Sequence, residues 1–333
     1  MKKIGVLLIN LGTPDNPGIF KVGRYLLEFL NDWRVIDIPL ILRRFLVSFI
    51  IVPIRMFSSS KEYKKLWTKK GSPLMFHSLN LKNQIQNKID SNYEINLAMR
   101  YNNPSIKKVL NEMEKKKYDE LIIFPLYPQY ASSSSGTAIE SSIKVISKWW
   151  AIPKIKIISE FFEDQGYINS IIQNVKKFKY QEYDHIIFSY HGLPNSHIKK
   201  LKIKNCLIDC NCHKITNNRY CYKSNCTITT DILAKKLNLD VNKYSMTFQS
   251  RLTNKWLTPF TDKKVKELAA DGVKKILVLS PAFVSDCLET IIEIKEALEE
   301  EFIKMGGEKL DLVPSLNSNE MWVESMIKMI KNS

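Results

Sequence analysis

Residues 185–194 read His-Ile-Ile-Phe-Ser-Tyr-His-Gly-Leu-Pro, and this stretch predicts a buried strand that ends in a sharp turn. Three further apolar runs of strand length occur at 4–10, 121–125 and 275–279. Segments with helical periodicity alternate with them at 19–30, 106–116, 166–178 and 261–270. This alternation predicts an α/β fold with a mainly parallel sheet, whose ligands bind at the carboxyl ends of the strands.

The two halves of the chain repeat one pattern. Residues 9–14, Ile-Asn-Leu-Gly-Thr-Pro, resemble residues 189–194, and each stretch follows an apolar strand. Residues 126–132 resemble residues 279–285 in the same way. We therefore predict two similar Rossmann-like halves, 1–150 and 151–333, with parallel sheets that face a central cleft.

The repeat also shows where the halves differ. His191 stands where the first half has Leu11, and Glu289 stands where it has Gly136. A titratable group therefore follows both strands of the second half only. This asymmetry predicts a catalytic site on the second half.

The residue types at these positions suit proton transfer and metal binding. The imidazole of His191 titrates near neutrality and can take a proton or bind a metal. Glu289 and Glu293 are four residues apart, and Asp286 precedes Glu289 by three, so we expect all three on one helix face. Such a row of carboxylates can pass protons or guide a divalent cation. A helix N-terminus also favours acids through its dipole, which suffices for the acidic run 299–301.

Taken together, these segments resemble the ferrochelatases, the ATP-independent chelatases that complete haem. The family's Ser-x-His-Gly-x-Pro strand end is present at 189–194, and its Ser-Asp-x-x-Glu-Thr-x-x-Glu pattern at 285–293. Further stretches that are similar to family signatures lie at 10–14, 71–74, 99–101, 125–129 and 247–251. The resemblance thus extends over nearly the whole chain, and it implies a lyase that inserts Fe²⁺ into protoporphyrin IX, the terminal step of haem biosynthesis.

The resemblance also implies roles for individual residues. His191 would accept protons from the pyrrole nitrogens or hold the incoming iron, and Glu289 would share that work. Glu293 and Asp286 would extend a carboxylate path from Glu289. The residues predicted to bind the substrate are Leu11, Ser72, Arg100, Tyr101, Trp256 and Phe283.

Other functions compete with this interpretation. The substrate could be coproporphyrin, or the enzyme could be a cobalt chelatase acting on a uroporphyrin-derived ring, although that ring's many carboxylates call for more arginines. A haem-binding protein without turnover needs an axial ligand but no proton path, so Glu289 and Glu293 favour an enzyme. A nucleotide-dependent enzyme is disfavoured because no Gly-x-Gly-x-x-Gly or Walker sequence follows the strands.

A cysteine-rich stretch at about 198–226 is the main departure from the family pattern and reads as an insertion. Five of the six cysteines lie in it. In a chain without a secretory signal, such clustering indicates metal or redox chemistry, with free thiols as the alternative. A [2Fe–2S] cluster or zinc is expected on Cys206, Cys210, Cys212 and Cys221, where Cys226 or His213 could replace one ligand.

Charge and hydropathy bear on partners and location. The formal charge of +16 favours an anionic partner, but the lysines are spread along the chain and no nucleic-acid module is present, so no nucleic acid is expected. Residues 1–10 are too short an apolar start for a signal peptide, and no run reaches about 18 apolar residues, so a cytoplasmic protein is expected. The apolar stretch 35–57, with Arg43 and Arg44, resembles the family's membrane-touching lip and predicts peripheral contact with the inner membrane.

Overall fold

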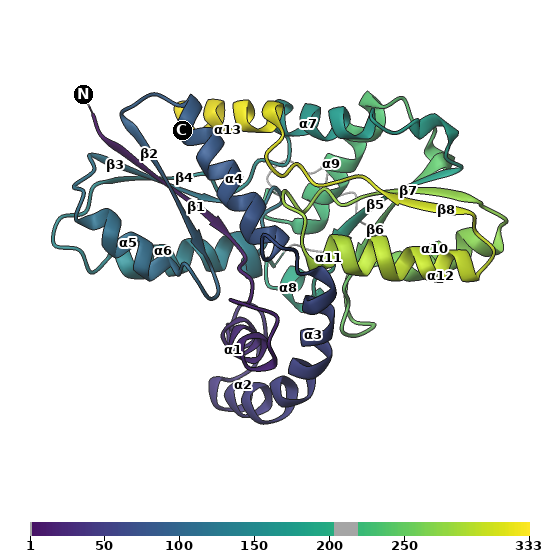
Figure 1. Ribbon diagram of the computed structural model, residues 1–333, viewed down its shortest axis with the longest axis horizontal. Coiled ribbons are helices and arrows are strands. Elements are labelled where there is room, and N and C mark those ends of the chain that lie inside the picture. The colour runs from purple at the N-terminus through teal and green to yellow at the C-terminus, as the bar shows by residue number, and fades with distance from the viewer. Residues whose placement is uncertain (1, 203–218) are drawn as a thin grey trace. The chain divides into compact units, whose positions relative to one another are not determined.

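The computed structural model describes residues 2–202 and 219–333 (Figure 1). The chain divides into two compact units. The first comprises Met1–Tyr127, Ser132–Glu160 and Val323–Ser333, and the second comprises Pro128–Ala131 and Phe161–Trp322. Each unit is built on one four-stranded sheet.

Both sheets are parallel throughout and have the same topology. In the first unit the strand order is β2-β1-β3-β4, with bounds β1 Ile4–Asn10, β2 Tyr93–Met99, β3 Glu120–Pro125 and β4 Lys154–Ile157. In the second it is β6-β5-β7-β8, with bounds β5 His185–His191, β6 Tyr244–Gln249, β7 Lys275–Leu279 and β8 Lys309–Leu312. The predicted α/β fold with two similar parallel halves is confirmed.

Helices cover both faces of the first sheet. The helical segments are α1 Ile19–Leu30, α2 Leu40–Phe45, η1 Leu46–Ile51, α3 Val52–Leu66, α4 Pro73–Lys88, α5 Ile106–Glu114, η2 Ser132–Gly136, α6 Thr137–Ile146 and α13 Glu320–Asn332. In Figure 1, α5 and α6 lie on one side of this sheet and α4 on the other. Segments η1 and η2 are π-helical.

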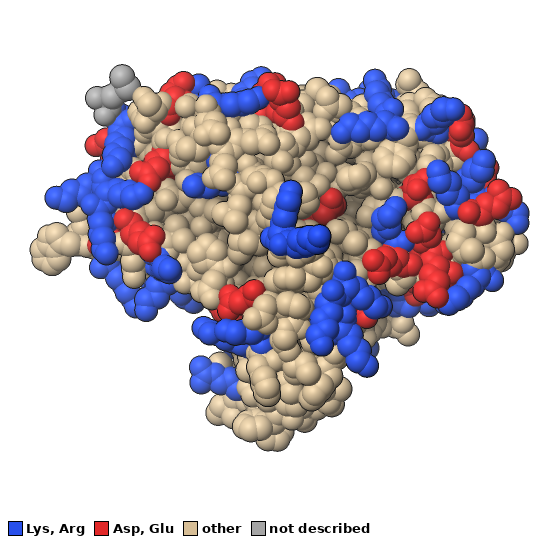
Figure 2. All heavy atoms as spheres, in the orientation of Figure 1, with Lys and Arg blue, Asp and Glu red and all other residues tan. Residues whose placement is uncertain are grey.

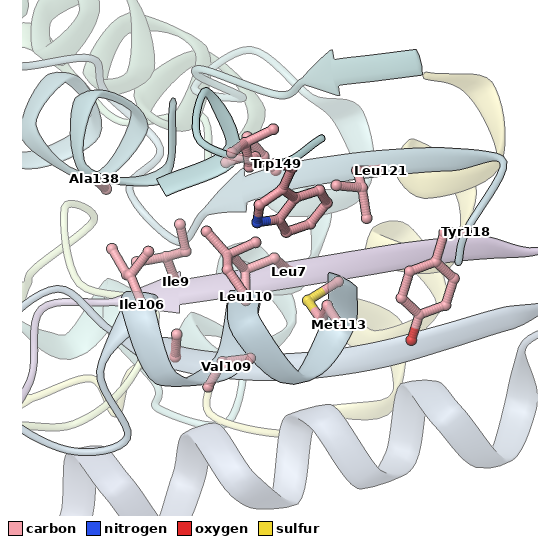
Figure 3. Packing of buried hydrophobic residues seen from close by; sticks show 13 residues of the cluster. Leu7, Ile9, Ile106, Val109, Leu110, Met113, Tyr118, Leu121, Ala138 and Trp149 are labelled. Carbon is pink, nitrogen blue, oxygen red and sulfur yellow. The ribbon is translucent and has the colours of Figure 1, made fainter. Parts of the chain in front are cut away.

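The core of the first unit follows from the sequence of α5. Its apolar residues Ile106, Leu110 and Met113 recur at helical spacing, so they form one face. That face packs on Leu7 and Ile9 of β1 (Figure 3). Because β1 is buried at every residue, it must be apolar on both faces.

The second unit repeats this arrangement. Its helical segments are α7 Gln165–Val175, η3 Tyr180–Glu182, α8 Asn195–Lys199, α9 Tyr222–Lys236, η5 Val241–Lys243, α10 Thr261–Ala270, α11 Leu288–Thr290, η6 Ile291–Leu298 and α12 Glu299–Lys304. Val265 of α10, Leu298 of η6 and Phe302 of α12 pack on Ile187 and Val278 of the sheet. In Figure 1, α7 and α9 lie on the opposite side of this sheet.

Backbone hydrogen bonds repeat as well. After β2 the chain turns back so that the Met99 N–H donates to the Pro104 carbonyl, over 2.7 Å. After β6 the Phe248 N–H donates to the Pro259 carbonyl in the same manner, over 2.8 Å. Leu11 and His191 thus stand at equivalent ends of the central strands β1 and β5, in agreement with the repeat in the sequence.

Candidate active site

His191 is the last residue of β5 and is half-buried. Its Nδ1 lies 2.6 Å from the carbonyl oxygen of Gly192. A carbonyl can only accept, so Nδ1 is the donor in this contact, which leaves Nε2 as the second ring nitrogen. The backbone of His191 is fixed by Tyr222, whose buried hydroxyl donates to the His191 carbonyl over 2.9 Å. His191 therefore presents a nitrogen that can take a proton or bind a metal.

Two aromatic side chains flank this imidazole. The ring centroids of Trp256 and Phe283 lie 6.4 and 6.3 Å from that of His191. Trp256 is placed there because residues 193–195 pair with residues 255–257, for example through the Leu257 N–H and the Leu193 carbonyl, 2.9 Å apart. The close approach requires Gly192, since a Cβ at that position would lie 2.9 Å from the Gln249 carbonyl oxygen and 3.2 Å from the Trp256 ring.

Glu289 is fixed to the same sheet edge by Gln249. Gln249 ends β6, is buried, and donates from Nε2 to the Glu289 carbonyl over 2.8 Å. Its Oε1 accepts from the Ser189 hydroxyl of β5 over 2.7 Å. A second contact comes from Cys287, whose thiol pKa is raised by burial and by the neighbouring Glu289 carboxylate. The backbone of Glu289 is therefore held to the strand end that carries His191.

Glu293 lines a cavity of the second unit. Its carboxylate accepts a hydrogen bond from the Ser250 hydroxyl. Both residues line a cavity of about 400 Å³, together with Gln249 and the ion-paired Arg251 and Asp262. This cavity lies within the second unit, beside the Gln249 amide that holds Glu289.

The expectation that Asp286 shares a helix face with Glu289 and Glu293 is wrong. Asp286 lies in the loop before α11, which begins at Leu288, so it shares no helix face with the two glutamates. Both Asp286 carboxylate oxygens accept hydrogen bonds, from the Ser315 N–H over 3.0 Å and from the Asn317 amide over 2.7 Å. Asp286 is thus engaged with the loop that follows β8.

Four of the predicted substrate residues belong to the first unit. Leu11 and Arg100 follow β1 and β2 and are part-exposed, and the Tyr101 N–H donates to the Leu11 carbonyl over 2.9 Å. Gly12 is required here, because its φ is +114° and a Cβ would lie 2.0 Å from the Tyr101 carbonyl oxygen. Ser72 is buried and accepts a hydrogen bond from the Thr13 hydroxyl over 2.9 Å.

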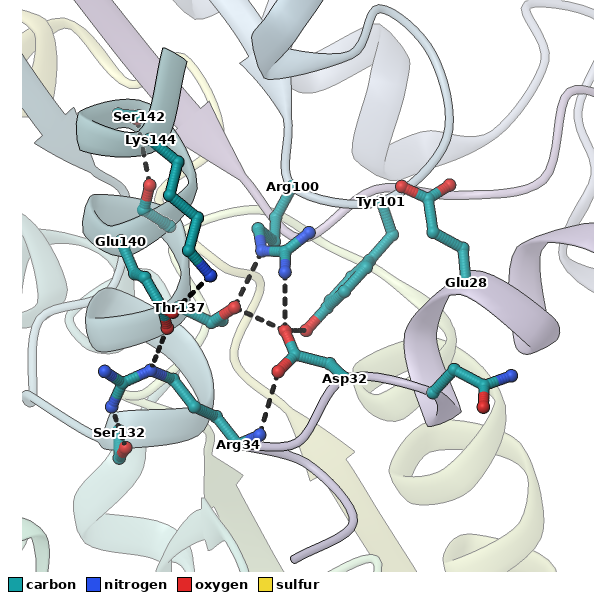
Figure 4. Close-up of polar contacts among 12 residues, drawn as sticks. Glu28, Asp32, Arg34, Arg100, Tyr101, Ser132, Thr137, Glu140, Ser142 and Lys144 are labelled. Carbon is teal, nitrogen blue, oxygen red and sulfur yellow. Dashed lines mark hydrogen bonds and ion pairs between the residues drawn. The ribbon is translucent and has the colours of Figure 1, made fainter. Parts of the chain in front are cut away.

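A buried carboxylate organises this edge of the first unit (Figure 4). Asp32 accepts from Arg100 Nη2 over 2.6 Å, from the Tyr101 hydroxyl over 2.8 Å and from the Thr137 hydroxyl. Its other oxygen accepts from the Arg34 N–H over 2.8 Å. Burial raises the pKa of Tyr101 well above its usual range, and Arg100 beside it does not offset this. Tyr101 therefore stays protonated, and its hydroxyl donates a hydrogen bond to Asp32.

Sequence reasoning did not assign a role to Asp32, Gln249 or Tyr222. Each forms a hydrogen bond to a predicted site residue that is distant in sequence: Asp32 to Arg100, Gln249 to Glu289 and Tyr222 to His191. No sequence motif marks such a contact. Gln249 lies in the family-like stretch 247–251, which was the one available signal.

The predicted metal ligands of the cysteine-rich stretch fall mainly outside the described residues. Cys206, Cys210, Cys212 and His213 all lie there. Cys221 and Cys226 are described; both are buried, and burial raises the pKa of the Cys226 thiol. Within residues 2–202 and 219–333, no group of three His, Cys, Asp or Glu side chains could hold a metal ion.

Solved structures similar to the chain share its fold. SirB from Bacillus subtilis with Fe³⁺ superposes with a TM-score of 0.56 at 11% identity, covering 99% of this chain and 95% of that one. The sirohydrochlorin chelatase SirB from Bacillus subtilis subspecies spizizenii, in complex with cobalt, has a TM-score of 0.54 at 9% identity, covering 99% and 94%.

Sequence relatives are much nearer. The family model described as Ferrochelatase matches residues 3–333. A ferrochelatase of Legionella pneumophila (strain Paris) is 42% identical and covers 98% of both chains, and one of Coxiella burnetii (strain Dugway 5J108-111) is 40% identical, covering 99% of this chain and 94% of its own. The chain belongs to the ferrochelatase family, the metal chelatases that insert ferrous iron into a porphyrin in haem synthesis.

Proposed function

We propose that this ferrochelatase converts protoporphyrin IX to protohaem at a centre formed by His191 and Glu289. One observation carries the proposal. The imidazole of His191, whose Nδ1 is engaged by the Gly192 carbonyl, lies beside the aromatic rings of Trp256 and Phe283, and Glu289 is held to the same sheet edge through Gln249.

The reaction needs a base beside an apolar wall. Two inner N–H protons of the porphyrin must leave before Fe²⁺ can enter the ring. The flat rings of Trp256 and Phe283 suit the faces of the macrocycle, and binding a bent ring would turn the nitrogen lone pairs towards one side. His191 and Glu289 then take up the protons and place the metal, and Glu293 extends the carboxylate path along its cavity.

The first unit supplies the remaining substrate contacts in this proposal. Leu11 contacts the macrocycle, and Arg100 pairs with a propionate, for which a guanidinium is the best-suited cation. Tyr101 and Ser72 are both buried, and they would hold the turn after β1 through the Leu11 carbonyl and the Thr13 hydroxyl. One arginine among the proposed pocket residues favours a substrate with few carboxylates, hence protoporphyrin over coproporphyrin or a uroporphyrin-derived ring.

Metal insertion by two variants tests the catalytic pair. His191→Ala and Glu289→Gln should each lower kcat by about 100-fold or more, because a positioned acid or base contributes that much. Porphyrin affinity should change little, since the aromatic walls remain. Purified protein would be assayed anaerobically with Fe²⁺, or with Zn²⁺, against protoporphyrin and coproporphyrin, and porphyrin binding would be followed by fluorescence quenching.

Glu296→Gln is the matched control. Glu296 is exposed on η6, next to the proposed path but outside it, so its variant should insert metal at the wild-type rate. Wild-type insertion by either His191→Ala or Glu289→Gln would remove the catalytic assignment. A preference for coproporphyrin would overturn the substrate but leave the pair in place.

We further propose a cytoplasmic enzyme that contacts the inner membrane through residues 35–57. No helix of residues 2–202 and 219–333 is long and apolar enough to cross a bilayer. Segments α2, η1 and α3 expose Ile41, Phe45, Phe49 and Ile54, and this part of the surface is mostly uncharged in Figure 2. An amphipathic surface of this kind suits the boundary between headgroups and acyl chains.

Arg43 does not belong to the lipid-facing set. It is buried, and its guanidinium donates to the carbonyls of Asn31 and Ile38 over 2.9 Å each. The exposed Arg44 and Arg55 are therefore the cations proposed to meet anionic lipid.

For the cysteine-rich stretch we propose metal binding. Cys206, Cys210, Cys212 and Cys221 would hold a [2Fe–2S] cluster or zinc, with Cys226 or His213 able to replace one of them. Visible absorption and the metal content of the purified protein distinguish the cluster, zinc and free thiols.

A further inference from the structure

We propose that Asp286 is a positioning residue, which forms a reciprocal clamp with Asn317 and thereby fixes the loop that presents Glu289. This role replaces the proton-carrying or metal-guiding role expected from the sequence. The inference rests on the proposed function of Glu289.

Asp286 and Asn317 bind each other through both backbone and side chain. Asn317 Nδ2 donates to Asp286 Oδ2 over 2.7 Å, and the Asp286 N–H donates to Asn317 Oδ1 over 2.9 Å. The Asn317 N–H also donates to the Val284 carbonyl over 2.7 Å, and the Ser315 N–H donates to Asp286 Oδ1 over 3.0 Å. Four hydrogen bonds thus join the loop after β7 to the loop after β8.

The partner loop is itself anchored to the body of the second unit. The Val313 N–H donates to the Val278 carbonyl of β7 over 2.9 Å. Asn174 of α7 donates from Nδ2 to the carbonyls of Pro314 and Ser315, over 3.2 and 3.3 Å. A fixed loop therefore holds Asp286, and Asp286 holds the segment that leads into α11.

The donors around Asp286 do not suit proton transfer. They are a peptide N–H and a side-chain amide, and neither group gives up a proton near neutral pH. Asp286 also lies outside the helical turn that carries Glu289. Its contacts instead resemble those of an orienting carboxylate, which uses its oxygens to lock a loop.

The clamp complements the Gln249 contact described above. Gln249 holds the Glu289 carbonyl from the sheet, and the clamp holds the chain three residues earlier. Loosening either one would let the Glu289 carboxylate drift. A displacement near 1 Å can cost about 100-fold in rate.

Exchanging Asp286 and Asn317 distinguishes a positioning role of Asp286 from proton transfer or metal guidance. Asp286→Asn alone places two amides against each other, and Asn317→Asp alone places two carboxylates together, so both should lower kcat by about 10-fold or more with little change in porphyrin affinity. The double variant Asp286→Asn/Asn317→Asp restores donors opposite acceptors. Its kcat should return to within about threefold of wild type.

A carboxylate that carries protons or guides iron makes the opposite prediction. The double variant, with its charge moved to position 317, would then stay as slow as Asp286→Asn, and that result would overturn the clamp. The KM for Fe²⁺ gives a second measurement, should the double variant fold poorly: a clamp lowers kcat of Asp286→Asn at constant KM, whereas a metal guide raises KM. Thermal unfolding of each variant checks its fold.

Glu289→Gln belongs in the same series. If it keeps the wild-type rate, the proposed role of Glu289 fails whatever the exchange shows. If it abolishes insertion and the exchange does not restore it, the clamp fails alone.

Discussion

Asp32 shows how many neighbouring groups one buried carboxylate can orient. It is 8% exposed and accepts from two other side chains that the sequence did place, Arg100 and Tyr101. Charge-assisted hydrogen bonds of this kind are strong, and a buried cation left without its partner is costly. The orientation of Arg100 therefore depends on a residue 68 positions away in sequence.

Asp32→Asn should destabilise the protein by about 3 kcal/mol, because the Arg100 charge loses its counter-ion while still largely buried. Urea unfolding followed by circular dichroism measures the loss. Glu112→Gln serves as control, since Glu112 is exposed on α5 and should change stability by less than about 0.5 kcal/mol. An Asp32→Asn protein as stable as this control would show that the Asp32 contacts contribute nothing.

Residues of this supporting kind mark the limit of sequence reasoning. His191 and Glu289 follow apolar strands and break an internal repeat, so the sequence singles them out as candidates. Asp32, Gln249 and Asn317 are ordinary polar residues whose partners come together only in three dimensions. The Asp286 interpretation failed for the same reason, because its spacing suited a helix that begins two residues later.

At the level of elements, the sequence predicted the central strands and missed the edges. β1, β3, β5 and β7 are almost wholly buried, so they read as continuous apolar runs. The edge strands are part-exposed and carry polar residues, so no such run marks them; they are β2, β4, β6 and β8. The π-helical segments also escaped notice, since apolar spacing does not distinguish them from α-helices.

The segment 35–57 should bind membranes through its exposed aromatic side chains. Phe45→Ser/Phe49→Ser should weaken binding to vesicles that contain anionic lipid by about 10-fold or more, because two phenyl rings no longer enter the interface. Sedimentation with vesicles measures this. Stability should hardly change, since the two side chains are 56% and 72% exposed.

Trp150→Ser provides the matched comparison. Trp150 is fully exposed but lies outside this segment, so its variant should sediment like wild type. Arg44→Gln/Arg55→Gln should reduce the preference for anionic over neutral vesicles by about 30-fold, at about 1 kcal/mol for each charge. Equal binding of Phe45→Ser/Phe49→Ser and wild type would exclude the segment as the contact.

Across the whole molecule, the two units should respond differently to acid. Burial, with the nearby Lys264, lowers the pKa of His185 in the second unit to about 4. Burial alone would raise the pKa of Glu140 in the first unit, but the hydrogen bonds from Arg34 and Lys144 outweigh it and lower the pKa to about 2. The neutral His185 stabilises the fold above its unfolded pKa of about 6.5, and this contribution falls as the pH drops from 6.5 to 4.

His185→Gln should therefore flatten the pH dependence of stability. Between pH 7 and pH 5 the wild type should lose about 2 kcal/mol more than the variant, because the unfolded chain binds a proton that folded His185 refuses. Urea titrations at the two pH values measure the difference. The Glu140 contribution is a poor explanation for any loss in this range, since it disappears only as the pH falls from about 4.5 towards 2. Parallel losses in both proteins would refute the His185 assignment.

The way the chain is divided between the two units affects how the protein folds during its synthesis on the ribosome. Residues 323–333 belong to the first unit, where Lys331 pairs with Asp90 over 2.8 Å, and the side chains of Val323, Met326 and Ile330 are buried. These residues follow the whole second unit in the sequence and are synthesised after it. The first unit therefore stays incomplete, with apolar surface uncovered, until residues 323–333 have been translated. A nascent chain stalled before residue 323 is the form of this protein that most needs a chaperone.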